Sequence, residues 1–158
     1  KRKIPNLTQG YSQLPRMFKM PNLMVKDGVF AFNPQMEWTG GGMASSVSDL
    51  AKWAKIYYEG IVFSKPMLKK VIQINANKVM GKTSYGMGSF IFNTSLGEAF
   101  GHSGFMPGYN AILAYFPKQK VSISLQINCD YATKKINLMY YVIQLVNLEL
   151  KSIENKNS

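Results

Sequence analysis

The chain has 158 residues, of which 46% are hydrophobic, so it can form one domain with a real core but not two domains of ordinary size. Nineteen Lys and Arg against eight Asp and Glu give a net charge of +11, which favours anionic partners such as nucleic acid, anionic lipid or a cell-wall polymer. The basic residues are scattered in ones and twos without a nucleic-acid-binding signature, so no specific nucleic acid is predicted as a partner.

One cysteine, Cys129, and one histidine, His102, exclude an internal disulfide and leave no transition-metal site at zinc spacing. We therefore expect no metal and no cofactor. No apolar run approaches the span of a bilayer, and the charged start of residues 1–5 is unlike a signal peptide. Because the first residue is not Met, we expect a processed product or a piece of a longer protein.

The first part of the chain is irregular in pattern. Prolines break every periodic run in residues 1–40, which predicts irregular segments and short helical turns. The segment 46–49 has the Ser-x-x-acid form of a capping box and precedes an amphipathic run, which predicts a helix over about 47–59. Pro66 is placed to begin a second, shorter helix that ends near residue 75.

The period then changes to that of strands. Residues 85–92 predict a strand interrupted by two glycines, followed by a turn at 94–97. Further strands are predicted over 99–104, 111–116 and 121–128, the last of them with strict alternation of apolar and polar residues. Short connections between successive strands predict an antiparallel meander.

The last periodic segment, 136–150, has an apolar helical stripe. A helix this apolar must be packed, and we interpret it as packing across the sheet. Residues 151–158 are polar and are predicted to fray. The fold class is therefore α+β, with an antiparallel sheet of about three strands packed by a C-terminal helix. We divide it into an irregular and helical region, 1–84, and a sheet-and-helix region, 85–158, together forming a fragment of one larger domain.

The only histidine lies in the segment 101–110, which reads Gly-His-Ser-Gly-Phe-Met-Pro-Gly-Tyr-Asn. Gly101 and Gly104 bracket His102 and Ser103 in a predicted strand, where glycine costs stability unless another backbone comes close. A substrate peptide that pairs with an exposed sheet edge would bring its backbone this close. Because alternation points His102 and Ser103 to opposite faces, both serve one ligand only if the strand lies at an edge. A structural or surface histidine beside a small serine remains the alternative.

Two nearby motifs are interpreted as structural. Residues 82–84, Lys-Thr-Ser, superficially match a Lys-Thr-Gly box, but no strand pattern surrounds them and we predict a loop. Residues 85–88, Tyr-Gly-Met-Gly, lack the Lys-Ser/Thr and the helix of a phosphate loop, so we predict a bent strand.

Four motifs occur in order: 40–53 (GGGMASSVSDLAKW), 85–88, His-Ser-Gly at 102–104, and Gly-Tyr-Asn-Ala at 108–111. With this order and spacing the chain resembles the C-terminal half of class C type β-lactamase-related proteins over roughly residues 7–150. That group of penicillin-recognising serine hydrolases includes D-Ala-D-Ala carboxypeptidases, D-aminopeptidases and esterases. The resemblance implies part of a β-lactamase/transpeptidase-like fold and an extracytoplasmic location, periplasmic or secreted.

The resemblance also implies acyl transfer through a serine ester, with a peptide-like or β-lactam small molecule as substrate. His102 would be the cleft-lining base or cation, and the backbone N–H of Phe105 one of two oxyanion-hole donors. Substrate binding would fall to Ser103, to Gly104 and, at the end of its strand, to Asn128.

The chain departs from the family pattern at the nucleophile. No Ser or Thr is followed by Lys three residues later, and no Tyr by Asn two residues later. We therefore expect the missing N-terminal part of a longer hydrolase to supply both motifs, and this piece to be inactive alone and to self-associate through exposed strand edges. The alternatives are a remnant that no longer catalyses, and a non-catalytic binding module that uses its basic surface.

Overall fold

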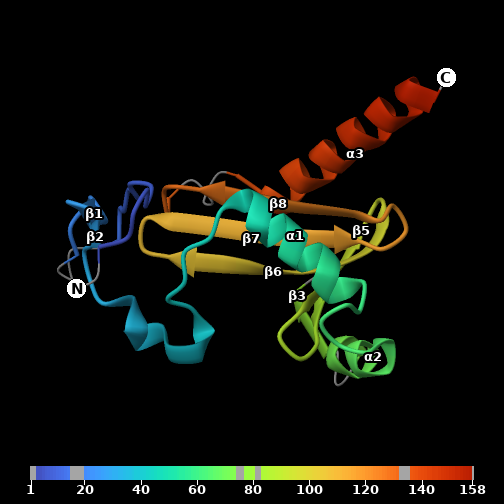
Figure 1. Cartoon of the computed structure of the whole chain (residues 1–158), viewed down its shortest axis with the longest axis horizontal. Helices are drawn as coiled ribbons and strands as arrows, with labels where there is room; N and C mark the ends of the chain where they lie inside the picture. Colours follow the sequence, from blue (N-terminus) through green and yellow to red (C-terminus); the bar gives the residue numbers. More distant parts are fainter. Residues whose placement is uncertain (1–2, 15–19, 74–76, 81–82, 132–135, 158) are drawn as a thin grey trace. The chain divides into compact units, whose positions relative to one another are not determined.

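The computed structural model describes residues 3–14, 20–73, 77–80, 83–131 and 136–157. They form an α+β arrangement with antiparallel sheets and a C-terminal helix, which confirms the predicted fold class (Figure 1). The elements in chain order are β1 (Val25–Lys26), β2 (Val29–Phe30), the 3-10 helix η2 (Pro34–Gly40), α1 (Val47–Tyr58), α2 (Lys65–Gln73), β3 (Asn77–Met80), β4 (Thr83–Tyr85), β5 (Phe90–Thr94), β6 (Gly97–Met106), β7 (Tyr109–Phe116), β8 (Val121–Ile127) and α3 (Leu138–Asn157).

The main sheet has six strands in the order β3-β4-β5-β6-β7-β8, and a separate two-stranded sheet joins β1 and β2. The three predicted strands after residue 98 are confirmed as β6, β7 and β8. The predicted helices correspond to α1, α2 and α3. The chain follows a meander, because each strand pairs with the one before it in sequence.

Three sequence-based expectations were wrong. Residues 85–92 do not form one interrupted strand: β4 ends at Tyr85 and β5 begins at Phe90, and the Gly86 N–H donates to the Ser89 carbonyl in the turn between them. Thr83 and Ser84, predicted to lie in a loop, belong to β4, whereas Lys82 lies outside the described residues. The C-terminal helix does not end near residue 150 but continues to Asn157.

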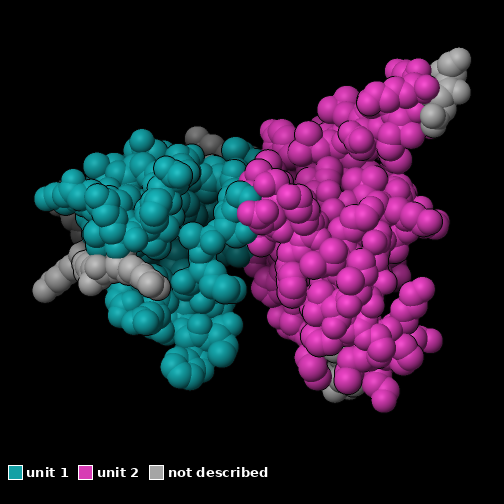
Figure 2. Space-filling view, in the orientation of Figure 1, with its two compact units in different colours: residues 1–46, 104–111, 126–136 teal, residues 47–103, 112–125, 137–158 magenta. Residues whose placement is uncertain are grey.

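The chain divides into two compact units, coloured in Figure 2. Unit 1 comprises residues 1–46, 104–111 and 126–136, and unit 2 comprises residues 47–103, 112–125 and 137–158. Strands β6, β7 and β8 contribute residues to both units. The predicted division after residue 84 stays a prediction.

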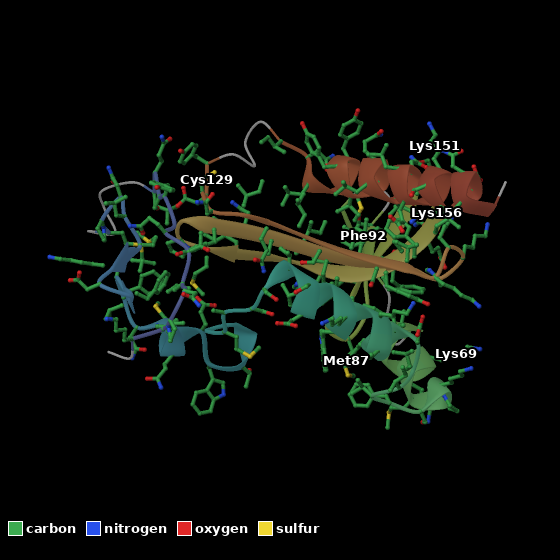
Figure 3. All side chains as sticks on the ribbon, turned by 45° about the horizontal axis from the view of Figure 1, so that its top comes forward. Lys69, Met87, Phe92, Cys129, Lys151 and Lys156 are labelled. Carbon is green, nitrogen blue, oxygen red and sulfur yellow. The ribbon has the colours of Figure 1, made fainter. Side chains whose placement is uncertain are left out.

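Within unit 2, helices cover both faces of the sheet. Ala99 packs in the cluster under α3, and its neighbour Phe100 packs against the cluster of α1 and α2. Successive strand residues point to opposite faces, so α3 lies on one face and α1 and α2 on the other. Phe92 lies on the α3 side (Figure 3). The buried residues of the α3 cluster are Ala99, Ile112, Ala114, Phe116, Val142 and Val146.

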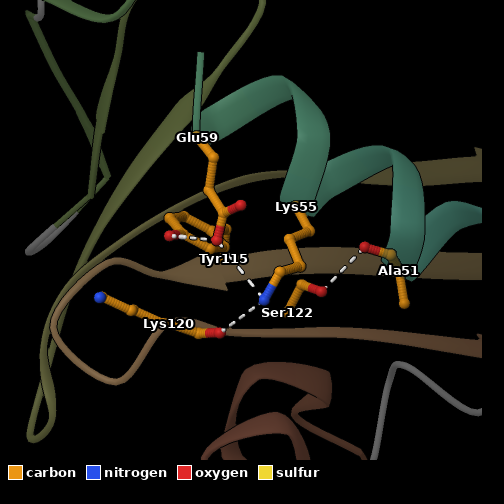
Figure 4. Close-up of polar contacts among 6 residues, drawn as sticks. All are labelled: Ala51, Lys55, Glu59, Tyr115, Lys120 and Ser122. Carbon is orange, nitrogen blue, oxygen red and sulfur yellow. Dashed lines mark hydrogen bonds and ion pairs between the residues drawn. The ribbon is translucent and has the colours of Figure 1, made fainter. Parts of the chain in front are cut away.

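Polar contacts fasten α1, and Glu59 directly after it, to β7 and β8 (Figure 4). The Ser122 hydroxyl donates to the Ala51 carbonyl at 2.8 Å, and the Tyr115 hydroxyl donates to Glu59 Oε1 at 3.2 Å. Lys55 Nζ lies 3.5 Å from the same carboxylate oxygen. Burial, and then the negative charge of Glu59, raise the pKa of Tyr115, so its hydroxyl remains a donor at neutral pH.

Strand β8 ends the sheet order, so among the described strands it forms an open edge. Its sequence, VSISLQI, has no charge and no proline, the residues that usually protect an edge from pairing with another chain. Exposed Tyr141, Leu145 and Leu148 on α3 add an uncovered apolar surface in unit 2.

We therefore expect the 158-residue chain to self-associate with rising concentration in light scattering. Gln126→Lys, which places a charge on an exposed residue of β8, should shift the distribution toward the monomer. A monodisperse monomer at every concentration would contradict this expectation.

Candidate functional site

Strand β6 carries four of the five predicted site residues in succession: His102, Ser103, Gly104 and Phe105. All four are exposed. The pairing of β5 with β6 runs from Thr94↔Gly97 to Phe90↔Gly101 and stops one residue before His102. On the side of β5, the described strands therefore leave the second half of β6 without a partner, and we call this the open edge of β6. The strand itself lies between β5 and β7 and is not the edge strand that the sequence argument required.

His102 has both ring nitrogens in hydrogen bonds. Its Nδ1 lies 2.6 Å from the Ser103 carbonyl oxygen, and its Nε2 lies 3.0 Å from the Tyr85 hydroxyl. A carbonyl oxygen can only accept, so Nδ1 carries the proton and, in the neutral ring, Nε2 accepts from Tyr85. The imidazole also lies near the Phe90 ring, with centroids 4.9 Å apart. His102 is therefore held in one tautomer at the start of the open edge.

Gly101 and Gly104, which bracket His102 and Ser103, differ in how much space the fold leaves for a side chain. At Gly101 a Cβ would lie 2.0 Å from the Leu113 carbonyl oxygen, so the close backbone that the sequence argument required there is β7 of the same chain, not a substrate. At Gly104 a Cβ would meet only the Ala111 side chain, at an ordinary 3.7 Å. The fold therefore requires glycine at position 101 but leaves space at position 104.

Three of the predicted residues, Gly104, Phe105 and Asn128, lie in unit 1. Phe105 has a side chain that is 57% exposed. Asn128 directly follows β8, and its Nδ2 donates to the Gln9 carbonyl at 3.0 Å. One amide N–H of Asn128 is thus used to hold the N-terminal segment.

A buried carboxylate, not predicted from the sequence, holds the turn that ends β6. Asp130 Oδ2 accepts from the Gly108 N–H at 3.0 Å and from the Ser12 hydroxyl, and Oδ1 accepts from the Gln13 N–H at 2.9 Å. Burial raises the pKa of Asp130, but these hydrogen bonds outweigh it and lower the pKa below its ordinary value. Asp130 therefore stays ionised and ties three segments of unit 1 together.

Other tyrosines of the described chain are poor candidates for proton transfer. Burial raises the pKa of Tyr58 to about 12, although its hydrogen bond with Ser89 acts in the opposite direction. Burial also raises the pKa of Tyr109, whose hydroxyl donates to the Thr8 carbonyl at 2.6 Å. Both hydroxyls stay protonated near neutral pH.

Sequence reasoning missed Tyr85 and Asp130. Tyr85 was interpreted as part of a bent strand, and its contact with His102 depends on the register of three strands, which no local pattern gives. The available signal for Asp130 was a carboxylate shortly after an apolar strand, in a chain with only eight acidic residues. Among the described residues, no three metal-binding side chains gather, and no helix is long and apolar enough to span a bilayer.

Solved structures similar to this fold are hydrolases and a penicillin-binding protein. The D-amino acid amidase from Ochrobactrum anthropi SV3, solved with L-phenylalanine amide, has a TM-score of 0.67 at 20% identity, covering 95% of this chain and 43% of the amidase. A D-stereospecific amidohydrolase from Streptomyces sp. has a TM-score of 0.65 at 22% identity, covering 81% of this chain and 36% of its own. A penicillin-binding protein from Bacillus halodurans has a TM-score of 0.59 at 15% identity, covering 87% of this chain and 39% of its own.

The chain thus spans less than half the length of each of these structures. At such identities the likeness concerns the fold. No curated protein sequence matches the chain significantly. A protein-family model described as beta-lactamase matches residues 1–148, which include the open edge of β6 and the turn held by Asp130, and the chain therefore belongs to the beta-lactamase family.

Proposed function

We propose that this chain forms part of a serine hydrolase that cleaves peptide-like amides, esters or β-lactams through an acyl-enzyme. The observation that carries the proposal is the open edge of β6, which begins at His102, directly beyond the last residue paired with β5. An extended peptide can add to such an edge by backbone hydrogen bonds. Membership of the beta-lactamase family supports this class of reaction.

In the proposed reaction, a serine hydroxyl attacks the substrate carbonyl, its proton passes to a base, and the carbonyl oxygen becomes an oxyanion. Collapse of this intermediate expels the amine or alcohol, and water then releases the acid. The Phe105 N–H would donate to the oxyanion, as an oxyanion-hole donor does. Ser103 would donate to the substrate, and Gly104 would leave room for its backbone.

In this proposal the longer protein supplies the nucleophilic serine and its lysine, because the 158 residues contain neither Ser-x-x-Lys nor Tyr-x-Asn. We propose that this protein acts outside the cytoplasm. The amidase from O. anthropi was solved with L-phenylalanine amide, which supports small amides as one substrate class for our proposal. A peptide of the cell wall is another.

The test is the intact mass of the 158-residue chain and of its longer parent after incubation with a fluorescent penicillin. We expect a covalent adduct on the parent only. An adduct on the isolated chain would contradict the placement of the nucleophile. No adduct on either would remove penicillin from the substrates and strengthen the binding-module alternative. That alternative needs a concentrated basic surface. The lysines labelled in Figure 3 lie on two different helices, Lys69 on α2 and Lys151 and Lys156 on α3.

Gly104 provides a sharper test of the open edge. In the parent, Gly104→Ala is expected to lower the rate of acylation about tenfold or more, because a methyl group would occupy the space left for the substrate backbone, a loss of roughly 1.4 kcal/mol. Its thermal stability should hardly change, because the new Cβ meets only Ala111. Gly40→Ala, where a Cβ has almost open space, is the matched control and should leave acylation unchanged. An unaltered rate in Gly104→Ala would argue against substrate along this edge.

A further inference from the structure

We propose that Tyr85 is the positioning residue for His102, and that its hydroxyl, by donating to Nε2, selects the tautomer in which Nδ1 carries the proton and Nε2 is the basic nitrogen of the ring. This inference rests on the proposed function, because it concerns the site at the open edge of β6. It gives His102 a tyrosine partner from within the 158 residues, although they contain no Tyr-x-Asn motif.

Strand register brings the two residues together. Tyr85 on β4 is paired with Phe90 on β5, and Phe90 is paired with Gly101 on β6, the residue before His102. The Tyr85 ring packs edge-on against the Phe90 ring, with centroids 4.7 Å apart and planes at 64°. The imidazole lies 4.9 Å from the same ring. The phenyl ring of Phe90 is therefore a common support, and the Tyr85 hydroxyl spans from β4 to β6 over the end of β5.

The two hydrogen bonds of His102 act in the same sense. The Ser103 carbonyl accepts only, so it favours a proton on Nδ1, and the Tyr85 hydroxyl donates, so it favours a bare Nε2. Both stabilise one neutral tautomer and disfavour the other. Without the hydroxyl, the ring keeps only the bond to the carbonyl of the adjacent residue, and Nε2 is free to carry the proton instead.

The consequence for chemistry lies at Nε2. A general base must present its lone pair in a fixed direction to the proton that it accepts. In the neutral ring, Nδ1 is occupied by its own proton, so Nε2 is the basic nitrogen, and a reacting group must take the place of the Tyr85 hydroxyl to deliver a proton to it. Before that exchange, Tyr85 keeps Nε2 unprotonated and fixes the orientation of the imidazole.

The single histidine makes the proposal directly measurable. In ¹⁵N NMR of the chain with a neutral imidazole, we expect Nδ1 at the shift of a protonated nitrogen and Nε2 at that of a bare one. In Tyr85→Phe, which keeps the ring against Phe90, the two shifts should move toward each other. Loss of one hydrogen bond corresponds to roughly a threefold to tenfold change in the tautomer ratio. Tyr141→Phe, which removes an exposed hydroxyl from α3, is the control and should leave both shifts unchanged.

A wild-type histidine with its proton on Nε2, or shifts in Tyr85→Phe identical to those of the wild type, would overturn the proposal. The measurement needs no turnover and no ligand, so its outcome is separate from that of the penicillin experiment. A parent without adduct but with the expected histidine shifts would refute the proposed hydrolase and leave the Tyr85–His102 pairing in place.

Discussion

Replacement of Gly101 by alanine is expected to destabilise the chain by about 3 kcal/mol or more, at the upper end of what overpacking costs. The added Cβ would lie 2.0 Å from the Leu113 carbonyl oxygen and 3.0 Å from Ala114 Cα. These are backbone atoms of β7, so no flexible side chain can move to make room. Strands β6 and β7 would have to separate at the centre of the sheet.

The measurement is urea unfolding followed by far-UV circular dichroism, with Gly104→Ala as the matched control three residues further along the same strand. A Cβ at Gly104 meets only the Ala111 side chain at 3.7 Å, so its midpoint should stay close to that of the wild type. Equal midpoints for the Gly101 and Gly104 variants would show that β6 and β7 are not in this close contact. The pair separates a glycine that the fold needs from one that the proposed substrate needs.

Asp130→Asn is the second substitution with a large expected effect, a loss of about 2 to 3 kcal/mol in the free energy of unfolding. Both carboxylate oxygens of Asp130 accept hydrogen bonds, from Gly108 and Ser12 at one and from Gln13 at the other. An asparagine has only one acceptor oxygen, so its amide nitrogen would face at least one of these donors. That donor would be left buried without a partner.

The effect of Asp130 on stability should depend on pH in a defined direction. Its pKa in the folded chain is lowered from the ordinary value of 3.8, so the unfolded chain binds this proton first as the pH falls. The stabilisation is complete above pH 3.8 and is lost as the pH falls through the lower folded value. The difference between wild type and Asp130→Asn should therefore be full at pH 7 and shrink below pH 3.8.

Unfolding curves over this pH range provide the test. Asp27→Asn is the control, because Asp27 is exposed and asparagine tolerates its positive φ of 53°. A difference between wild type and Asp130→Asn that does not change with pH would mean that the carboxylate is not held as a buried anion.

Local patterns were sufficient for the elements whose residues repeat with one clear period. The apolar stripe of α1 and the alternation of β8 each predicted the element to within two residues, because one face of α1 packs against the sheet of unit 2 and one face of β8 packs in the cluster under α3. The same reasoning failed at β4, where Thr83 and Ser84 show no alternation of their own. They belong to a strand because β5 lies beside them, which is a property of the sheet and not of the segment.

At the candidate site, too, local sequence predicted some features, whereas others depend on neighbouring strands. His102 and its neighbours stood out because a lone histidine between glycines is unusual in a strand. The difference between Gly101 and Gly104 was invisible in the sequence, because it depends on which backbone of β7 lies opposite each of them. The partner of His102 could not be found for a similar reason, because Tyr85 lies two strands away.

The hydrogen bonds of Tyr11 have a consequence for how the protein is made. Its N–H donates to the Asn128 carbonyl at 2.9 Å, and its carbonyl accepts from the Asp130 N–H at 3.2 Å. Residues near the start of this chain must therefore wait for residues near 130 to be synthesised before their native partners exist. Closing so long a loop is entropically costly and slows folding. During translation the segment around Tyr11 therefore lacks these native partners until residue 130 has been made, and we expect it to acquire its structure late.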